Sequence, residues 1–67
     1  MPLIQVNMLE GRTPEQKKAM LHAITAAVHE SIGAPVESIR VWIHEFPDTD
    51  FMAAGTLARD RHQPAVT

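Results

Sequence analysis

One long helical pattern lies between two strand patterns, and few folds accommodate this order in a chain of 67 residues. Thr13 is a good helix N-cap, Pro14 suits the first helical position, and Gln16 completes a capping box. Gly33 favours a left-handed C-cap, and Pro35 prevents the helix from continuing. These signals predict a helix over residues 14–32. Its predicted buried face is Met20, Ala23, Ile24, Ala27 and Val28, opposite a polar stripe of Glu15, Lys18, His22, Thr25 and His29.

Two strand patterns flank this helix. Residues 2–8 alternate apolar and polar side chains, and residues 39–46 are rich in β-branched and aromatic side chains. In the second strand Ile39, Val41 and Ile43 face one way, and Arg40, Trp42, His44 and Phe46 face the other. A helix that joins two strands of one sheet makes them parallel, with a right-handed crossover. Residues 47–50 predict a turn, residues 51–57 a short strand or hairpin, and residues 59–67 a loosely held tail.

The predicted fold class is α+β, a single domain over residues 1–67 with a parallel β-α-β unit and a short C-terminal hairpin. Two parallel strands under one helix leave one face and both edges open. The chain has no cysteine, so disulfides cannot supply the stability that so small a core lacks. We therefore expect a homo-oligomer to complete the sheet. The face that carries Arg40 and Trp42 then meets another subunit or a ligand.

Charge and composition exclude several classes of function. The formal net charge of −2 gives no electrostatic footprint for nucleic acid, and no apolar run is long enough to span a membrane. The N-terminus lacks the pattern of a signal peptide, so we expect a cytoplasmic protein. The histidines (His22, His29, His44 and His62) lack the spacing of metal ligands, and no phosphate-binding loop is present. We expect neither a metal nor a cofactor.

Several segments together resemble the 4-oxalocrotonate tautomerase family, the 2-hydroxymuconate tautomerases. They are Pro2 after the initiator, Leu9-Glu10-Gly11-Arg12-Thr13 before the helix, Ala34-Pro35 after it, and Ile39-Arg40-Val41 leading to Glu45. The match runs from Pro2 to about Leu57, which is nearly the whole chain. The resemblance implies a β-α-β unit with a C-terminal hairpin, assembled as a homohexamer of three dimers that needs no cofactor.

The resemblance also implies a catalytic site. In the family Met1 is removed and the exposed proline nitrogen is the catalytic base, a role that falls on Pro2. The two substrate-binding arginines fall on Arg12 and Arg40, and the hydrophobic wall falls on Phe51 and Leu9. The arginines around one proline come from more than one subunit. The implied reaction is keto–enol proton transfer on a small anionic 2-oxo or 2-hydroxy acid such as 2-hydroxymuconate, in the catabolism of aromatic hydrocarbons.

This chemistry needs these residue types. A secondary amine is mostly protonated at neutral pH, but an apolar pocket and nearby guanidinium groups disfavour its charged form and lower the pKa of Pro2. A guanidinium binds a carboxylate through two parallel hydrogen bonds and stabilises the negative charge that develops on a dienolate. Two such anchors fit a dicarboxylate. The rival roles are a solvated loop residue for Arg12 and an intersubunit salt bridge for Arg40.

Two other functions remain open on the same scaffold. The family commonly has more glycine where this chain has Met52-Ala53-Ala54-Gly55, and this difference leaves the substrate undetermined. A related branch dehalogenates chloroacrylates or decarboxylates three-carbon acids, and Glu45, Asp48 and Asp50 lie nearest to where its water-activating carboxylate is needed. If Met1 stays attached, the Pro2 nitrogen is an amide without a basic lone pair, and the chain is a non-catalytic assembly module.

Overall fold

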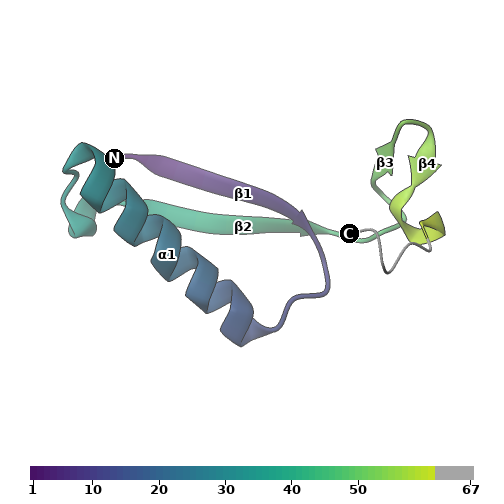
Figure 1. The fold of residues 1–67 in the computed structure, drawn as a ribbon, viewed down its shortest axis with the longest axis horizontal. Helices are drawn as coiled ribbons and strands as arrows, with labels where there is room; N and C mark the ends of the chain where they lie inside the picture. Colours follow the sequence, from purple (N-terminus) through teal and green to yellow (C-terminus); the bar gives the residue numbers. More distant parts are fainter. Residues whose placement is uncertain (62–67) are drawn as a thin grey trace.

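The computed structural model describes residues 1–61 and confirms the predicted strand-helix-strand order (Figure 1). Strand β1 spans Leu3–Leu9, helix α1 spans Pro14–Ile32 and strand β2 spans Arg40–Phe46. The strands are parallel, and the register pairs Leu3 with Arg40 and Leu9 with Phe46. Strand β2 begins one residue later than predicted, because Ile39 closes a 3₁₀ turn, η1 (Val36–Ser38).

The ends of α1 are fixed by the capping residues that the sequence signals. The Gln16 N–H donates to Thr13 Oγ1 at 3.1 Å, and the Thr13 N–H donates to Gln16 Oε1 at 3.0 Å. Gly33 adopts a left-handed conformation with φ of 75°, and its N–H donates to the His29 carbonyl at 3.0 Å. A residue with a Cβ would be strained at this φ, so glycine ends the helix here.

Helix α1 covers one face of the strand pair and diverges from it toward the helix N-terminus (Figure 1). Ile39 is the one described residue that is buried, with 7% of its surface exposed. The half-buried side chains of α1 are Lys17, Met20, Leu21, Ile24, Thr25 and Val28. The prediction that Ala23 and Ala27 are buried and that Thr25 belongs to the polar stripe was therefore wrong. The face that α1 turns toward the strands is rotated from the predicted one, toward Leu21 and Thr25 and away from Ala23 and Ala27.

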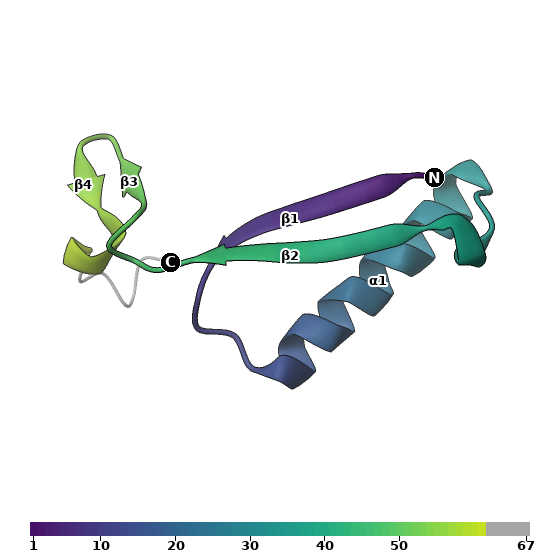
Figure 2. The ribbon, with the colours of Figure 1, turned by 180° about the vertical axis from the view of Figure 1, so that it is seen from behind.

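The other face of the strand pair is uncovered (Figure 2). Burial alternates along both strands, so Leu3, Gln5, Asn7 and Leu9 share the uncovered face with Arg40, Trp42 and His44. Trp42 has 44% of its surface exposed and Leu3 has 55%. Exposed apolar side chains of this size, in a row on a sheet, mark a contact surface.

A second, separate sheet follows β2. Strands β3 (Met52–Ala53) and β4 (Thr56–Leu57) pair antiparallel through a tight turn at Ala54 and Gly55, whose φ angles are 54° and 83°. This arm extends away from the β-α-β unit (Figures 1 and 2). The predicted hairpin is therefore confirmed.

The segment predicted to be a loose tail begins with a 3₁₀ turn, η2 (Ala58–Asp60). The Arg61 Nη2 group donates to the Ala53 carbonyl at 3.2 Å and ties this turn back to the hairpin. Residues 62–67, with His62, lie outside the described part of the chain. Within residues 1–61 no helix has the length and apolar character of a membrane span.

Candidate functional site

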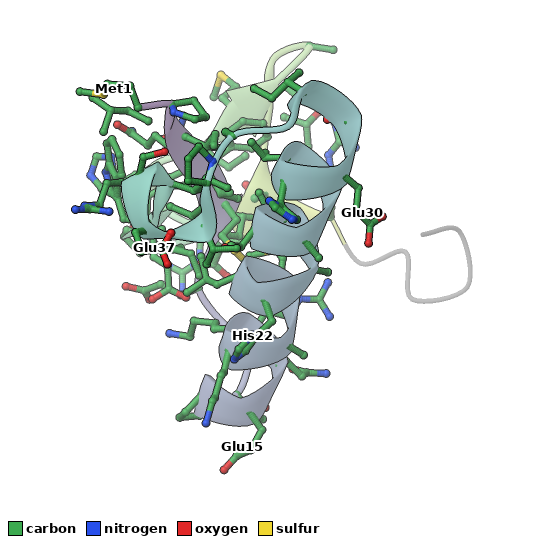
Figure 3. All side chains as sticks on the ribbon, turned by 90° about the vertical axis from the view of Figure 1, so that its left-hand side faces the viewer. Met1, Glu15, His22, Glu30 and Glu37 are labelled. Carbon is green, nitrogen blue, oxygen red and sulfur yellow. The ribbon has the colours of Figure 1, made fainter. Side chains whose placement is uncertain are left out.

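Pro2 lies at one end of the sheet, immediately before β1. Its carbonyl accepts a hydrogen bond from the Arg40 N–H at 3.1 Å, which fixes the start of the chain against β2. Met1 precedes it and is 75% exposed, whereas Pro2 is half-buried. The Met1 ammonium donates to the Ser38 carbonyl, and Ser38 Oγ donates to the Met1 carbonyl at 3.4 Å. Figure 3 shows Met1 and Glu37 on the same side of the molecule. Removal of Met1 would make the Pro2 nitrogen the start of the chain, while the Pro2 carbonyl keeps its bond from Arg40.

Arg40 lies at the same end of the sheet, and backbone carbonyls hold its guanidinium. Its Nη1 group donates to the carbonyl of Glu37 at 2.6 Å and to that of Ile39 at 3.4 Å. Among residues 1–61 no carboxylate lies within ion-pair distance of it. The side chain is exposed and stands on the uncovered face of the sheet. An arginine held by backbone carbonyls, without a counter-ion, is available to bind an anion.

Arg12 lies at the opposite end of the sheet, in the loop between β1 and α1. A hollow of about 390 Å³ is lined by Met8, Leu9, Glu10, Gly11 and Arg12. Gly11 has a φ of 132°, which only glycine adopts without strain, and this conformation turns the loop toward the helix. The exposed Arg12 has no ion-pair partner among the described residues. This end therefore presents a second uncompensated cation beside a hollow.

An apolar wall stands beside this loop. Leu9 pairs with Phe46 across the strands, and the Phe46 and Phe51 rings stack with centroids 5.6 Å apart and planes at 22°. Leu9 is 37% exposed and Phe51 is 42% exposed, so the wall is open on one side. The structure thus brings together Leu9 and Phe51, both predicted for the site. Phe46 was predicted only to lie on the strand face that meets another subunit or a ligand, and its place in the wall follows from the strand register.

The predicted site residues form two groups that do not meet within one chain. Pro2 and Arg40 lie where β1 begins. Leu9 is the last residue of β1, and Arg12 and Phe51 follow the ends of the two strands. The strand runs from Leu3 to Leu9, which at ~3.3 Å per residue separates the groups by about 20 Å. A muconate-sized ligand is far shorter than this distance. A single chain therefore holds two half-sites.

Other charged groups pair with one another, bond within a turn or lie exposed on α1. Lys17 Nζ lies 3.0 Å from Glu45 Oε1, an ion pair that joins α1 to the covered face of β2. Glu45 Oε2 is buried without a hydrogen-bond partner among the described residues. Asp50 accepts a hydrogen bond from Thr49 Oγ1 at 3.0 Å in an exposed turn. Glu15, His22 and Glu30 lie along the outer surface of α1 (Figure 3). No group of three potential metal ligands occurs within residues 1–61.

Comparison with known proteins agrees with this fold. A family model described as "Tautomerase enzyme" matches residues 2–61. The chain is 47% identical over 60 residues to a 2-hydroxymuconate tautomerase of Comamonas testosteroni, covering 90% of this chain and 95% of that protein. It is 48% identical over 61 residues to a probable tautomerase of Bacillus cereus, covering 91% of this chain and all of that protein.

Solved structures show the same likeness. A 4-oxalocrotonate tautomerase isozyme of Methylibium petroleiphilum superposes with a TM-score of 0.83 at 43% identity, over 87% of this chain and 94% of that chain. A heterohexameric 4-oxalocrotonate tautomerase of Chloroflexus aurantiacus superposes with a TM-score of 0.86 at 33% identity, over 90% of this chain and 97% of that chain. Sequence, fold and the match over residues 2–61 lead to one conclusion: the chain belongs to the tautomerase family and is an isomerase.

Proposed function

We propose that this isomerase transfers a proton between carbon and oxygen of an unsaturated 2-oxo or 2-hydroxy acid, with 2-hydroxymuconate as the reference substrate. The base is the Pro2 nitrogen, freed by the removal of Met1. The observation that carries the proposal is the position of Pro2. It is half-buried, its carbonyl is pinned at 3.1 Å by the Arg40 N–H, and it lies at the same strand end as an uncompensated guanidinium. The names of the relatives support the reaction class.

The working site combines half-sites of different chains. Because the Pro2 end of β1 lies about 20 Å from the end that leads to Arg12, a second copy completes the site, with its strands antiparallel to those of the first. The Pro2 end of one copy then meets the Arg12 end of the other, under the apolar wall of Leu9, Phe46 and Phe51. The uncovered sheet face, with Trp42 exposed, provides further contact surface for an assembly of several copies. A homohexamer is the assembly that we propose, in keeping with the hexameric relative.

Each residue then has a definite task. The Pro2 nitrogen takes a proton from one position of the substrate and returns it to another. Its ring restricts the direction of the lone pair, so little orientation is lost on reaction. The Arg40 guanidinium, at the 2-oxo end of the substrate, stabilises the negative charge of the dienolate. Arg12 anchors the distal carboxylate. The apolar wall excludes water and favours the neutral, basic form of the amine.

The test is a comparison of two substrates with enzyme whose intact mass shows that it begins at Pro2. We expect rapid ketonisation of 2-hydroxymuconate, followed by ultraviolet absorbance, and little chloride release from 3-chloroacrylate. Chloride release without ketonisation would assign the scaffold to dehalogenation. No turnover of either acid would leave assembly as the function.

A further inference from the structure

We propose that Phe46 is the positioning residue of the Arg12 half-site, acting through Phe51 and the loop that carries Arg12. It need not touch the substrate, because its contacts reach each segment from which this half-site is built. The inference rests on the proposed function for its kinetic consequence. Its structural content, that Phe46 holds the Phe51 ring in place, stands independently of any reaction.

Three contacts of Phe46 carry this proposal. Its ring stacks on Phe51 at 5.6 Å between centroids. Its register partner is Leu9, the other residue predicted for the wall. Its carbonyl accepts a hydrogen bond from the Glu10 N–H at 2.9 Å, which holds the chain two residues before Arg12. One residue at the end of β2 therefore fixes both the apolar wall and the start of the cationic loop.

The Phe51 ring has few other restraints. Phe51 precedes a short hairpin that projects from the β-α-β unit (Figure 2). Its surface is 42% exposed. Among the described residues, the stack with Phe46 is the one aromatic contact that it makes. Backbone bonds hold the segment around it, from Asp50 N–H to the Pro47 carbonyl at 2.9 Å and from Ala58 N–H to the Phe51 carbonyl at 2.8 Å. These bonds fix the main chain, and the ring of Phe46 fixes the ring of Phe51.

The first test is a double-mutant cycle on the full chain, with Phe46→Leu, Phe51→Leu and both together. Leucine keeps an apolar side chain at the strand end and removes only the stack. Phe46→Leu should raise KM for 2-hydroxymuconate about 2- to 10-fold, the effect expected from losing an aromatic pair, with a smaller change in kcat. Phe46→Tyr should leave KM close to the wild-type value, because tyrosine keeps the aromatic ring. In the Phe51→Leu background, Phe46→Leu should change KM by less than about 2-fold. Effects that multiply in the double variant would overturn the proposal.

The second test needs no turnover. The chain has two phenylalanines, so labelling with 4-fluorophenylalanine gives two ¹⁹F resonances, assigned with the two leucine variants. Phe46→Leu should shift and broaden the Phe51 resonance, and it should weaken the perturbation of that resonance by cis,cis-muconate, an unreactive dicarboxylate. An unchanged Phe51 resonance would refute the positioning role. A changed resonance in a protein that ketonises nothing would refute the proposed reaction and leave the role of Phe46 intact.

Discussion

A site shared between chains predicts that two variants, each defective in one half-site, restore each other when they are mixed. The first variant is Arg12→Ala in a chain that begins at Pro2. The second is a chain with an N-terminal extension, so that the Pro2 nitrogen is an amide while Arg12 is intact. Since the end of β1 that carries Pro2 lies about 20 Å from the end that leads to Arg12, no chain can use its own pair on one small ligand. In an assembly of one variant alone, every site should lack the same half, which is Arg12 in the first variant and the free Pro2 nitrogen in the second.

Mixing should create intact sites in a proportion set by chance. With equal amounts and full exchange of subunits, half of the Pro2 ends and half of the Arg12 ends are intact. About a quarter of the sites then combine two intact ends, provided that the ends come from different copies of a closed assembly. The assay is 2-hydroxymuconate ketonisation after mixing, with exchange followed by native mass spectrometry. A mixture of wild-type and extended chains, which should keep about half of the activity, is the control. If native mass spectrometry shows that subunits have exchanged and the mixture still turns over no faster than the separate variants, the shared site is refuted.

Three further predictions concern substrate binding and stability. Arg12→Ala should raise KM for a dicarboxylate several-fold more than KM for a monoacid, measured by steady-state kinetics, because it removes the anchor of the second carboxylate. Ala54→Gly should stabilise the protein by about 0.5 kcal/mol in urea unfolding, because it relieves a left-handed alanine with φ of 54° at some entropic cost. Lys17→Ala should destabilise the protein by about 1–2 kcal/mol, because it leaves the half-buried Glu45 without its partner at 3.0 Å, whereas the exposed Lys18→Ala control should change little.

The order of elements and the helix bounds were predictable because their signals are local. Each end of α1 is fixed by residues close to it in the sequence, which are Thr13 and Gln16 at the start and Gly33 at the end. The structure shows the corresponding hydrogen bonds. The alternation of side chains likewise gave the two faces of each strand. Local chemistry of this kind does not depend on what the element packs against.

The packing of the helix was less predictable. Ala23 and Ala27 fit the spacing of a buried face, yet they are exposed, because α1 docks on the strands through a face rotated toward Leu21. Thr25 fits the polar stripe, yet it is half-buried and donates to the Leu21 carbonyl at 2.8 Å. Periodicity gives an apolar arc, and the way in which the helix docks on its partner decides which residues of that arc are covered.

The candidate site shows the same division. The residue types at positions 2, 12 and 40 indicate amine and guanidinium chemistry, but their placement in two groups follows from the length of β1. The place of Phe46 in the wall depends on the register that sets it opposite Leu9 and on the turn that returns Phe51 to it. Neither the register nor the turn geometry is encoded in the spacing of the aromatic residues.

Whether the Pro2 nitrogen is the base can be tested by one paired measurement. Two preparations that differ only in the presence of Met1 are compared for the rate of 2-hydroxymuconate ketonisation, with matching circular dichroism and native mass. If Pro2 is the base, turnover is far above background for the chain that begins at Pro2 and at background for the chain that retains Met1. Equal turnover by both preparations would contradict it, because an amide nitrogen has no basic lone pair.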